Sequence, residues 1–190
     1  MILGITGGTG CGKTTLLKEI ENRGGLVLDC DAVYHELLTR DDALLSAIEA
    51  RFPGVVEDGQ LQRKKLGAIV FADEQALLDL NAITHGAIRA EIVRRLSENP
   101  SLAAIDAIAL FEGGLAELCD ATVAVCAPEG NRVERLMQRD GIPEEYARSR
   151  IRAQKSEDWF RAVCDHTLYN DGTRDEFREK CAAFLDGLLK

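Results

Sequence analysis

Residues 1–14 read MILGITGGTGCGKT, and this stretch decides which fold the chain can adopt. Residues 1–6 are a short apolar run, which favours a buried β-strand. A glycine cluster follows, and from Lys13 to Asn22 the apolar residues recur at helical spacing. Residues 7–14, GGTGCGKT, fit the pattern G-x-x-x-x-G-K-[ST] of a phosphate-binding loop (P-loop) between a strand and a helix. The sequence therefore predicts an α/β protein that binds a nucleotide.

The residues of this loop suit the chemistry of a triphosphate. Glycines let backbone amides curl around phosphates, and the N-terminus of the following helix adds partial positive charge. Lys13 is expected to reach the β- and γ-phosphates, and the hydroxyl of Thr14 is expected to bind Mg²⁺. The alternative is a glycine-rich turn with an accidental Lys-Thr pair, which the flanking strand and helix disfavour.

Apolar runs alternate with helical patterns along the rest of the chain. Four further strands are predicted over residues 26–29, 103–111, 121–127 and 166–169. Apolar strands separated by helices favour a parallel sheet that is covered on both faces. We predict a three-layer sandwich of the P-loop NTPase type with a five-stranded parallel sheet. A final helix is expected to bury one apolar face, made of Phe177, Cys181, Phe184, Leu185 and Leu188.

Two stretches break the alternation. Residues 31–100 contain no convincing strand, only helical patterns that are interrupted at Pro53-Gly54 and Asp58-Gly59. We expect a helical lobe there that binds the acceptor. Residues 131–155 hold seven basic and four acidic residues around the turn at 140–143 and predict a lid of two helices. The predicted division is therefore a core of 1–30, 101–130 and 156–190, a lobe of 31–100 and a lid of 131–155.

Composition excludes several classes of protein. The 190 residues carry 23 Lys and Arg against 32 Asp and Glu, a net charge of −9, which disfavours general nucleic-acid binding. No apolar run reaches about 18 residues, so we expect no membrane span. The N-terminus shows no leader, and the six cysteines form no C-x-x-C pair. We therefore expect six reduced thiols in a cytoplasmic protein that acts as a monomer.

The chemistry beyond the P-loop rests on two groups of charged residues. Asp29 and Asp31 end the second predicted strand, where either could cap the next helix or face the γ-phosphate; the residues alone leave both readings open. Arg132, Arg135 and Arg139 follow the spacing i, i+3, i+7 on one helical face. They could neutralise a transferring phosphoryl group or form a solvated face that pairs with Glu134.

The class of P-loop protein is narrowed by what the sequence lacks. The chain has no N-K-x-D motif, with which GTPases of this class read the base. Its 190 residues leave little room for the partner-facing extensions of motor and transport ATPases. These observations favour phosphoryl transfer to a small molecule.

The whole chain resembles the dephospho-CoA kinase family, which phosphorylates the ribose 3′-hydroxyl of dephospho-CoA with ATP to give coenzyme A. The matching segments occur in the family's order, and all except the P-loop are specific to it. They are ITGGTGCGKTT, LDCDAVYHELL, RKKLGAIVFAD, LNAITHGAIRAEI, ALFEGGLAELCDATVAV, RLMQRDGIPEEYARSRIRAQ and YNDG.

The resemblance implies a role for each matching residue. It implies that ATP and Mg²⁺ are held by Gly8, Gly10, Cys11, Gly12, Lys13, Thr14 and Thr15. It makes Asp31 the carboxylate that faces the ribose hydroxyl, which decides between the two readings above. Arg139, with Arg135, becomes the cation of the lid, and Asn170 is implied to lie near the adenine. On the acceptor side it implies contacts to dephospho-CoA from His85, Glu112 and residues 63–73.

Some assignments keep an alternative from the residues themselves. His85 could be a core histidine on a helix, and Glu112, expected at a strand end, could have a structural role. Gly86 and Ile108 stand where the family usually has proline, and Cys11 where it more often has serine. None of these changes removes a charged or ligating group, so we expect altered backbone geometry rather than lost activity.

Two other functions remain to be separated by experiment. The acceptor could be another nucleoside or nucleotide, which a comparison of acceptors would reveal. The chain could instead be a nucleotide-dependent switch or ATPase, which would hydrolyse ATP slowly without responding to small acceptors.

Overall fold

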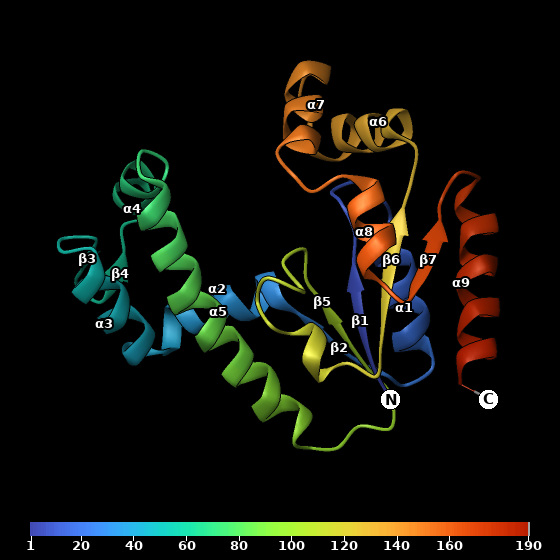
Figure 1. The fold of residues 1–190 in the computed structure, drawn as a ribbon, viewed down its shortest axis with the longest axis horizontal. Coiled ribbons are helices and arrows are strands. Elements are labelled where there is room, and N and C mark those ends of the chain that lie inside the picture. The colour runs from blue at the N-terminus through green and yellow to red at the C-terminus, as the bar shows by residue number, and fades with distance from the viewer. Residues whose placement is uncertain (190) are drawn as a thin grey trace. The chain divides into compact units, whose positions relative to one another are not determined.

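A five-stranded sheet forms the centre of the structure, a computed structural model that describes residues 1–189 (Figure 1). The strand order is β2-β5-β1-β6-β7, so the first strand lies in the middle. β1 pairs in parallel with β5 and β6, and β6 pairs in parallel with β7. The strands are β1 (Ile2–Thr6), β2 (Leu26–Asp29), β5 (Ala103–Asp106), β6 (Ala121–Cys126) and β7 (His166–Tyr169). The predicted P-loop type of sandwich is confirmed.

Helices cover both faces of the sheet. One face packs against α1 (Lys13–Asn22) and α9 (Arg174–Leu188), and the other packs against α8 (Glu157–Val163) through Phe160. The side chains of a strand alternate between faces, so Leu3 and Ile5 of β1 contact the layer of α1 and α9. The apolar face predicted for the last helix is confirmed, since its five residues all pack into this core.

The two helices predicted within residues 131–155 are also present, and we keep the name lid for this segment. α6 (Glu129–Asp140) and α7 (Glu144–Arg152) follow β6 and lie beyond the carboxyl ends of β1 and β6 (Figure 1). They share a small apolar core of their own, made of Val133, Leu136, Ala147 and Ile151. Gly141 ends α6 in the left-handed conformation, with a φ of 64°.

The chain forms two compact units, the first made of residues 1–28, 100–110 and 116–190, the second of 29–99 and 111–115. In the second unit the long helix α5 packs against the three helices that precede it. Its elements are α2 (Cys30–Arg40), α3 (Asp42–Arg51), β3 (Val56–Glu57), β4 (Gln60–Leu61), α4 (Arg63–Val70) and α5 (Glu74–Leu96). A short 3₁₀ helix, Ala116–Leu118, precedes β6.

Two predictions about strands were wrong. The segment 31–100 is mainly helical, but β3 and β4 form an antiparallel hairpin that is too short to produce a periodic pattern. The strand predicted over 103–111 ends at Asp106, and the chain continues in turns. Ala107 and Leu110 are nevertheless buried, because these turns fold back over the sheet, where a Cβ on Gly4 would lie 2.8 Å from Leu110 Cδ2. The apolar run continues beyond the end of β5 because Ala107 and Leu110 are buried, although they do not belong to a strand.

A buried carboxylate joins two helices of the second unit. Glu91 of α5 accepts hydrogen bonds from Arg40 of α2 at 2.6 Å and from Arg94 and Arg95 of its own helix at 2.8 Å each. The bonds from Arg94, followed by those from Arg95, hold the pKa of Glu91 at about 2, against the opposing effect of burial. Glu91 therefore stays charged at neutral pH and fastens α2 to α5.

We expect Glu91→Gln to lower the Tm of the protein at pH 7 by roughly 4–8 °C. Loss of a charged hydrogen-bond network costs about 2 kcal/mol, and each kcal/mol shifts a domain of this size by about 2–4 °C. Because folding lowers this pKa, the stabilisation is present above the ordinary glutamate pKa of about 4.3 and is lost as the pH falls toward about 2.

Calorimetry between pH 7 and pH 2 should therefore show the Tm difference between wild type and variant shrinking below about pH 4.3. The exposed Glu21 of α1 provides the matched control, and Glu21→Gln should leave Tm nearly unchanged. Equal melting temperatures of wild type and Glu91→Gln at pH 7 would contradict this role.

Candidate active site

The P-loop leaves the carboxyl end of the central strand and enters α1. Lys13, the first residue of α1, turns its ammonium group back to the carbonyl oxygen of Gly7 at 3.3 Å. The same Nζ lies 3.8 Å from Oδ1 of Asp106, and the two side chains are only 15% and 17% exposed. This half-buried ion pair holds the ammonium group of Lys13 beside the P-loop.

Asp106 contacts the P-loop lysine, and the sequence analysis did not single it out as a candidate site residue. It ends β5, the neighbour of β1, and parallel pairing brings the ends of both strands to one edge of the sheet. The predicted strand extended to residue 111, so Asp106 was placed inside it and not at its end. The sequence feature that could have identified Asp106 is an aspartate that follows the apolar residues 103–105.

The arrangement fits a magnesium ion that is shared with phosphates. Thr14 follows Lys13 with its side chain exposed, and Asp106 supplies a carboxylate at the same edge. Both offer hard oxygen ligands, which Mg²⁺ prefers, and Mg²⁺ bound with a nucleotide takes few ligands from the protein. Residues 1–189 contain no cluster of three His, Cys, Asp or Glu side chains that could hold a metal ion.

The outer side of the P-loop is held by residues of the lid. Nε of Arg132 donates to the carbonyl oxygen of Thr9 at 2.9 Å, and Nη1 of Arg135 donates to those of Gly10 and Cys11 at 3.2 and 3.4 Å. Arg132 is 8% exposed, so the reading of a solvated arginine face is wrong for this residue. Glu134, its expected partner, accepts a hydrogen bond from Gln138 instead.

Arg139 lies on an exposed part of the lid. Its Nε and Nη2 bind the two carboxylate oxygens of Asp140 at 2.6 and 3.0 Å, and Arg150 binds the same carboxylate at 2.6 Å. Arg139, followed by Arg150, lowers the pKa of Asp140 to about 2. Asp140 is therefore ionised at neutral pH, and its carboxylate binds both Arg139 and Arg150.

Asn170, directly after β7, supports the P-loop from a third direction. Its Nδ2 donates to the carbonyl oxygen of Cys11 at 2.9 Å, and the side chain is almost fully buried. Its Oδ1 is buried without a hydrogen-bond partner in the described structure. The contact explains Gly12, where a Cβ would lie 2.3 Å from Nδ2 and where φ is +99°.

The structure separates the two aspartates after β2. Asp29 caps α2, because its Oδ1 accepts the amide hydrogens of Asp31 and Ala32 at 2.9 and 3.1 Å. Asp31 lies in the first turn of α2 and is exposed, and no hydrogen bond or ion pair to its carboxylate is found within residues 1–189. The capping role therefore belongs to Asp29, and the carboxylate of Asp31 is available to a ligand.

The other acceptor-side residues belong to the second unit. His85 is half-buried on α5 and forms no hydrogen bond within the described chain, so it is not a fully buried core histidine. Glu112 was expected at a strand end; it is instead an exposed residue in the turns after β5. Residues 63–73 form α4 and the start of the connection to α5. Their roles remain predictions.

All six cysteines are free thiols, as expected. Cys11, within the P-loop, is 1% exposed. Burial raises its pKa, although the nearby Lys13 acts in the opposite direction. The thiol is therefore neutral and serves as a small apolar residue under the loop.

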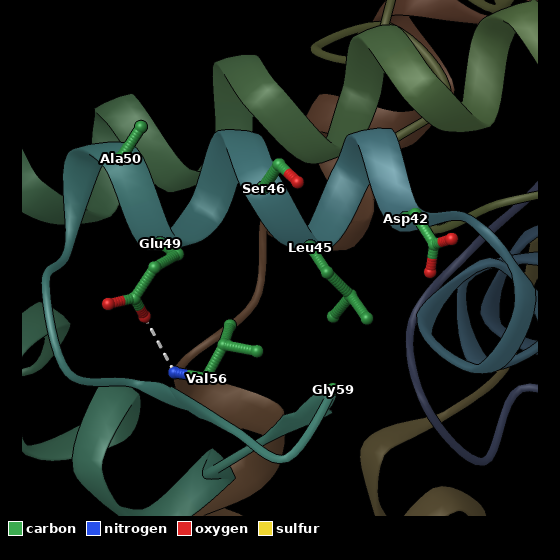
Figure 2. Close-up of a pocket in the computed structure, with 7 residues that line it drawn as sticks. All are labelled: Asp42, Leu45, Ser46, Glu49, Ala50, Val56 and Gly59. Carbon is green, nitrogen blue, oxygen red and sulfur yellow. Dashed lines mark hydrogen bonds between the residues drawn. The ribbon is translucent and has the colours of Figure 1, made fainter.

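A groove in the second unit is not the phosphate site. It lies between α3 and the β3–β4 hairpin and has a volume of about 540 Å³ (Figure 2). Leu45 and Val56 line it together with the carboxylates of Asp42 and Glu49, and Glu49 accepts the amide hydrogen of Val56 at 2.7 Å. A groove lined by carboxylates repels phosphate.

Comparisons with known proteins agree with this geometry. The family model described as dephospho-CoA kinase matches residues 1–176. A dephospho-CoA kinase of Thermobifida fusca is 36% identical over 192 residues, which cover 99% of this chain and 96% of that protein.

Solved structures extend the comparison. A Thermus thermophilus protein superimposes with a TM-score of 0.82 at 32% identity, covering 99% of this chain and 97% of that one. A dephospho-CoA kinase from Campylobacter jejuni shares the fold, with a TM-score of 0.69 at 24% identity over 98% and 96% of the two chains. None of the helices formed by residues 1–189 combines the length and apolarity needed to cross a membrane.

Gly12→Ala should weaken nucleotide binding by about a hundredfold or more, because the strained φ and the forced movement of Asn170 together cost about 3–4 kcal/mol. Titration calorimetry with ADP measures the effect. Gly24 is the matched control, since its φ is +75° but nothing lies within 4 Å of an added Cβ. Gly24→Ala should bind ADP like the wild type, and equal ADP affinity of the two variants would contradict the assigned close contact.

Proposed function

The chain belongs to the dephospho-CoA kinase family, and from that premise we propose that it transfers the γ-phosphoryl group of ATP to the ribose 3′-hydroxyl of dephospho-CoA. The observation that carries the chemistry is the P-loop with Lys13 held between Gly7 and Asp106. In the transfer, the 3′-oxygen forms a bond to the γ-phosphorus while the bond from that phosphorus to the β-phosphate bridge oxygen breaks. ADP and coenzyme A are the products, and the hydroxyl proton leaves to a base or to water.

We propose that ATP is bound by the amides of Gly8, Gly10, Cys11 and Gly12, by Lys13 and by the hydroxyls of Thr14 and Thr15. Lys13 is proposed to bind a phosphate oxygen of ATP while its contacts to Gly7 and Asp106, at 3.3 and 3.8 Å, keep it beside the loop. Asn170 is proposed to lie near the adenine of ATP, and Arg135 to act with Arg139 as a cation of the lid; their bonds to the carbonyl oxygens of Cys11 and Gly10 place both next to the P-loop.

Mg²⁺ would be held by Thr14 and, in our proposal, by Asp106. When bound, the ion neutralises charge on the β- and γ-phosphates and so lowers the barrier to transfer. Asp106 also keeps Lys13 oriented toward the phosphates, because the two groups form an ion pair 3.8 Å apart.

Asp31 is proposed to orient the 3′-hydroxyl and to accept its proton. The support is that Asp29 satisfies the helix cap, so the carboxylate of Asp31 remains available. Positioned bases of this kind contribute about 10²–10⁴-fold to a rate. His85, Glu112 and the lobe 31–100 are proposed to hold dephospho-CoA, as the family resemblance implies.

Closure of the lid 131–155 is proposed to bring Arg139 to the transferred group and to exclude water. Arg139 must then leave Asp140. That exchange is cheap, because exposed ion pairs contribute only about 0–1 kcal/mol. An acceptor-dependent closure would limit hydrolysis of ATP. We further propose that the enzyme acts as a cytoplasmic monomer.

Identification of the product tests the function directly. Incubation with Mg-ATP and dephospho-CoA should yield coenzyme A and ADP in equal amounts, detected by mass spectrometry. Adenosine and common nucleoside monophosphates should give little product, and Lys13→Ala should give almost none. Phosphorylation of one of those other acceptors at a higher rate, or ATP hydrolysis that ignores dephospho-CoA, would reject the proposal.

Asp31→Ala should lower kcat about a hundredfold or more while leaving ATP affinity within about twofold, since the carboxylate acts on the acceptor. Steady-state kinetics and ADP titration separate the two effects. Asp41 offers a matched control, because its carboxylate caps α3 in the same unit. Asp41→Ala should lose about 1 kcal/mol of stability and keep kcat. A normal kcat for Asp31→Ala would contradict the proposal that Asp31 is the base.

A further inference from the structure

Arg132 is a buried cation whose partners are neutral oxygens. Its guanidinium donates to Thr9 at 2.9 Å through Nε and approaches Oε1 of Gln154 at 3.5 Å through Nη2. None of the carboxylates in residues 1–189 forms an ion pair with it, although it is only 8% exposed. Burial of a charge is costly unless strong partners compensate for it. The place of this arginine beside the P-loop therefore needs an explanation.

The guanidinium occupies the space that a side chain at position 8 would take. A Cβ on Gly8 would lie 2.2 Å from Nη2 and 2.8 Å from Cζ of Arg132. Gly8 does not have a positive φ, unlike its neighbours Gly7 and Gly10. The backbone conformation at position 8 would therefore admit a side chain, but that side chain would have to displace the guanidinium of Arg132.

Both backbone groups of Thr9 are held by the lid. Its carbonyl oxygen accepts from Arg132 of α6, and its amide donates to Oε1 of Gln154 at 2.8 Å. Gln154 lies just after α7, so the two contacts come from the two helices of the lid or their immediate ends. Thr9, in the middle of the P-loop, is thus joined to the lid by two residues, Arg132 and Gln154.

These contacts orient the amides that a phosphate would meet. In a planar trans peptide, the carbonyl of one residue and the amide hydrogen of the next point in opposite directions. Holding the carbonyl of Thr9 toward α6 turns the amide hydrogen of Gly10 away from α6. Arg135 does the same at the next two peptides, through the carbonyls of Gly10 and Cys11.

We propose that Arg132, together with Gln154, is a positioning residue that holds the Thr9–Gly10 peptide of the P-loop in the orientation that binds phosphate and couples this peptide to the lid. The buried charge of Arg132 is then balanced when the polyphosphate of the nucleotide binds next to it. The residue touches no reacting atom and acts through the loop.

Hydrogen exchange of the nucleotide-free protein tests the positioning without any reference to catalysis. In Arg132→Ala, amides of the peptide spanning residues 8–12 should exchange at least about fivefold faster than in the wild type, since the loop loses its hold on Thr9. Arg148→Ala is the matched control: this lid arginine pairs with Glu129 and Glu144 and should leave that exchange unchanged. Unchanged exchange in Arg132→Ala would overturn the proposal, whatever the activity of the chain.

Kinetics test the consequence, and this part rests on the proposed function. Arg132→Ala should raise KM for ATP roughly tenfold, the size expected for one lost charged hydrogen bond, and leave KM for dephospho-CoA within about twofold. A purely structural role would lower the Tm and the amount of active enzyme without separating the two KM values. Equal changes in both KM values would therefore overturn the assignment.

A double-mutant cycle tests the link between positions 8 and 132. Gly8→Ala alone should raise KM for ATP at least as much as Arg132→Ala, because the new methyl group displaces the guanidinium. The double variant should be no worse than Arg132→Ala within about twofold, since the space is then free. Additive losses would show that Gly8 is required for another reason and would refute the proposed packing.

Discussion

The pairing of β1 on both sides is the constraint on which the rest of the site depends. Because β5 and β6 run parallel to β1, three chain segments leave the same edge of the sheet. One becomes the P-loop, one begins with Asp106, and one leads into the lid. The ion pair between Lys13 and Asp106 joins the first two, and the arginines of α6 join the first to the third. Parallel pairing thus assembles cations, a carboxylate and backbone amides that are far apart in sequence.

The carbonyl oxygens and the amides of the P-loop have different partners. Its carbonyl oxygens are satisfied by protein donors, from Arg132, Arg135 and Asn170. These contacts fix the directions of the peptides at residues 9–12 before an anionic ligand arrives, while the amide of Thr9 donates to Gln154 and that of Cys11 to the carbonyl oxygen of Gly8. Hydrogen-bond donors that are already oriented need not rearrange when negative charge develops in a transition state. Electrostatic catalysis depends on this preorganisation. Two of the basic residues of α6, Arg132 and Arg135, thus hold the shape of the loop.

The sequence predicted the elements that have a strong local signal. The strand over 26–29, the helix over Lys13–Asn22 and the two helices of the lid agree with the structure, since apolar periodicity and glycine turns mark them. Contacts over long sequence distances escaped the prediction. Gln154 is a neutral residue without a motif, and only the fold brings it to Thr9. Asp106 was hidden because Ala107 and Leu110 continue the apolar run after the strand has ended.

The two aspartates after β2 show what a residue pattern can and cannot decide. Asp29 and Asp31 have the same chemistry and nearly the same position, so their roles follow only from which carboxylate the helix amides take. The family resemblance selected Asp31 as the functional carboxylate, and the cap at Asp29 is consistent with that choice.

The burial of Cys11 affects how readily its thiol can be oxidised. Peroxide attacks a thiolate that it can reach, and here the sulfur is covered and its pKa is raised. A sulfur atom in the nucleotide cradle would otherwise offer a route to inactivation, through sulfenic acid or a mixed disulfide with glutathione. Covered by the loop, the sulfur at position 11, where the family more often has serine, is shielded from both reactions.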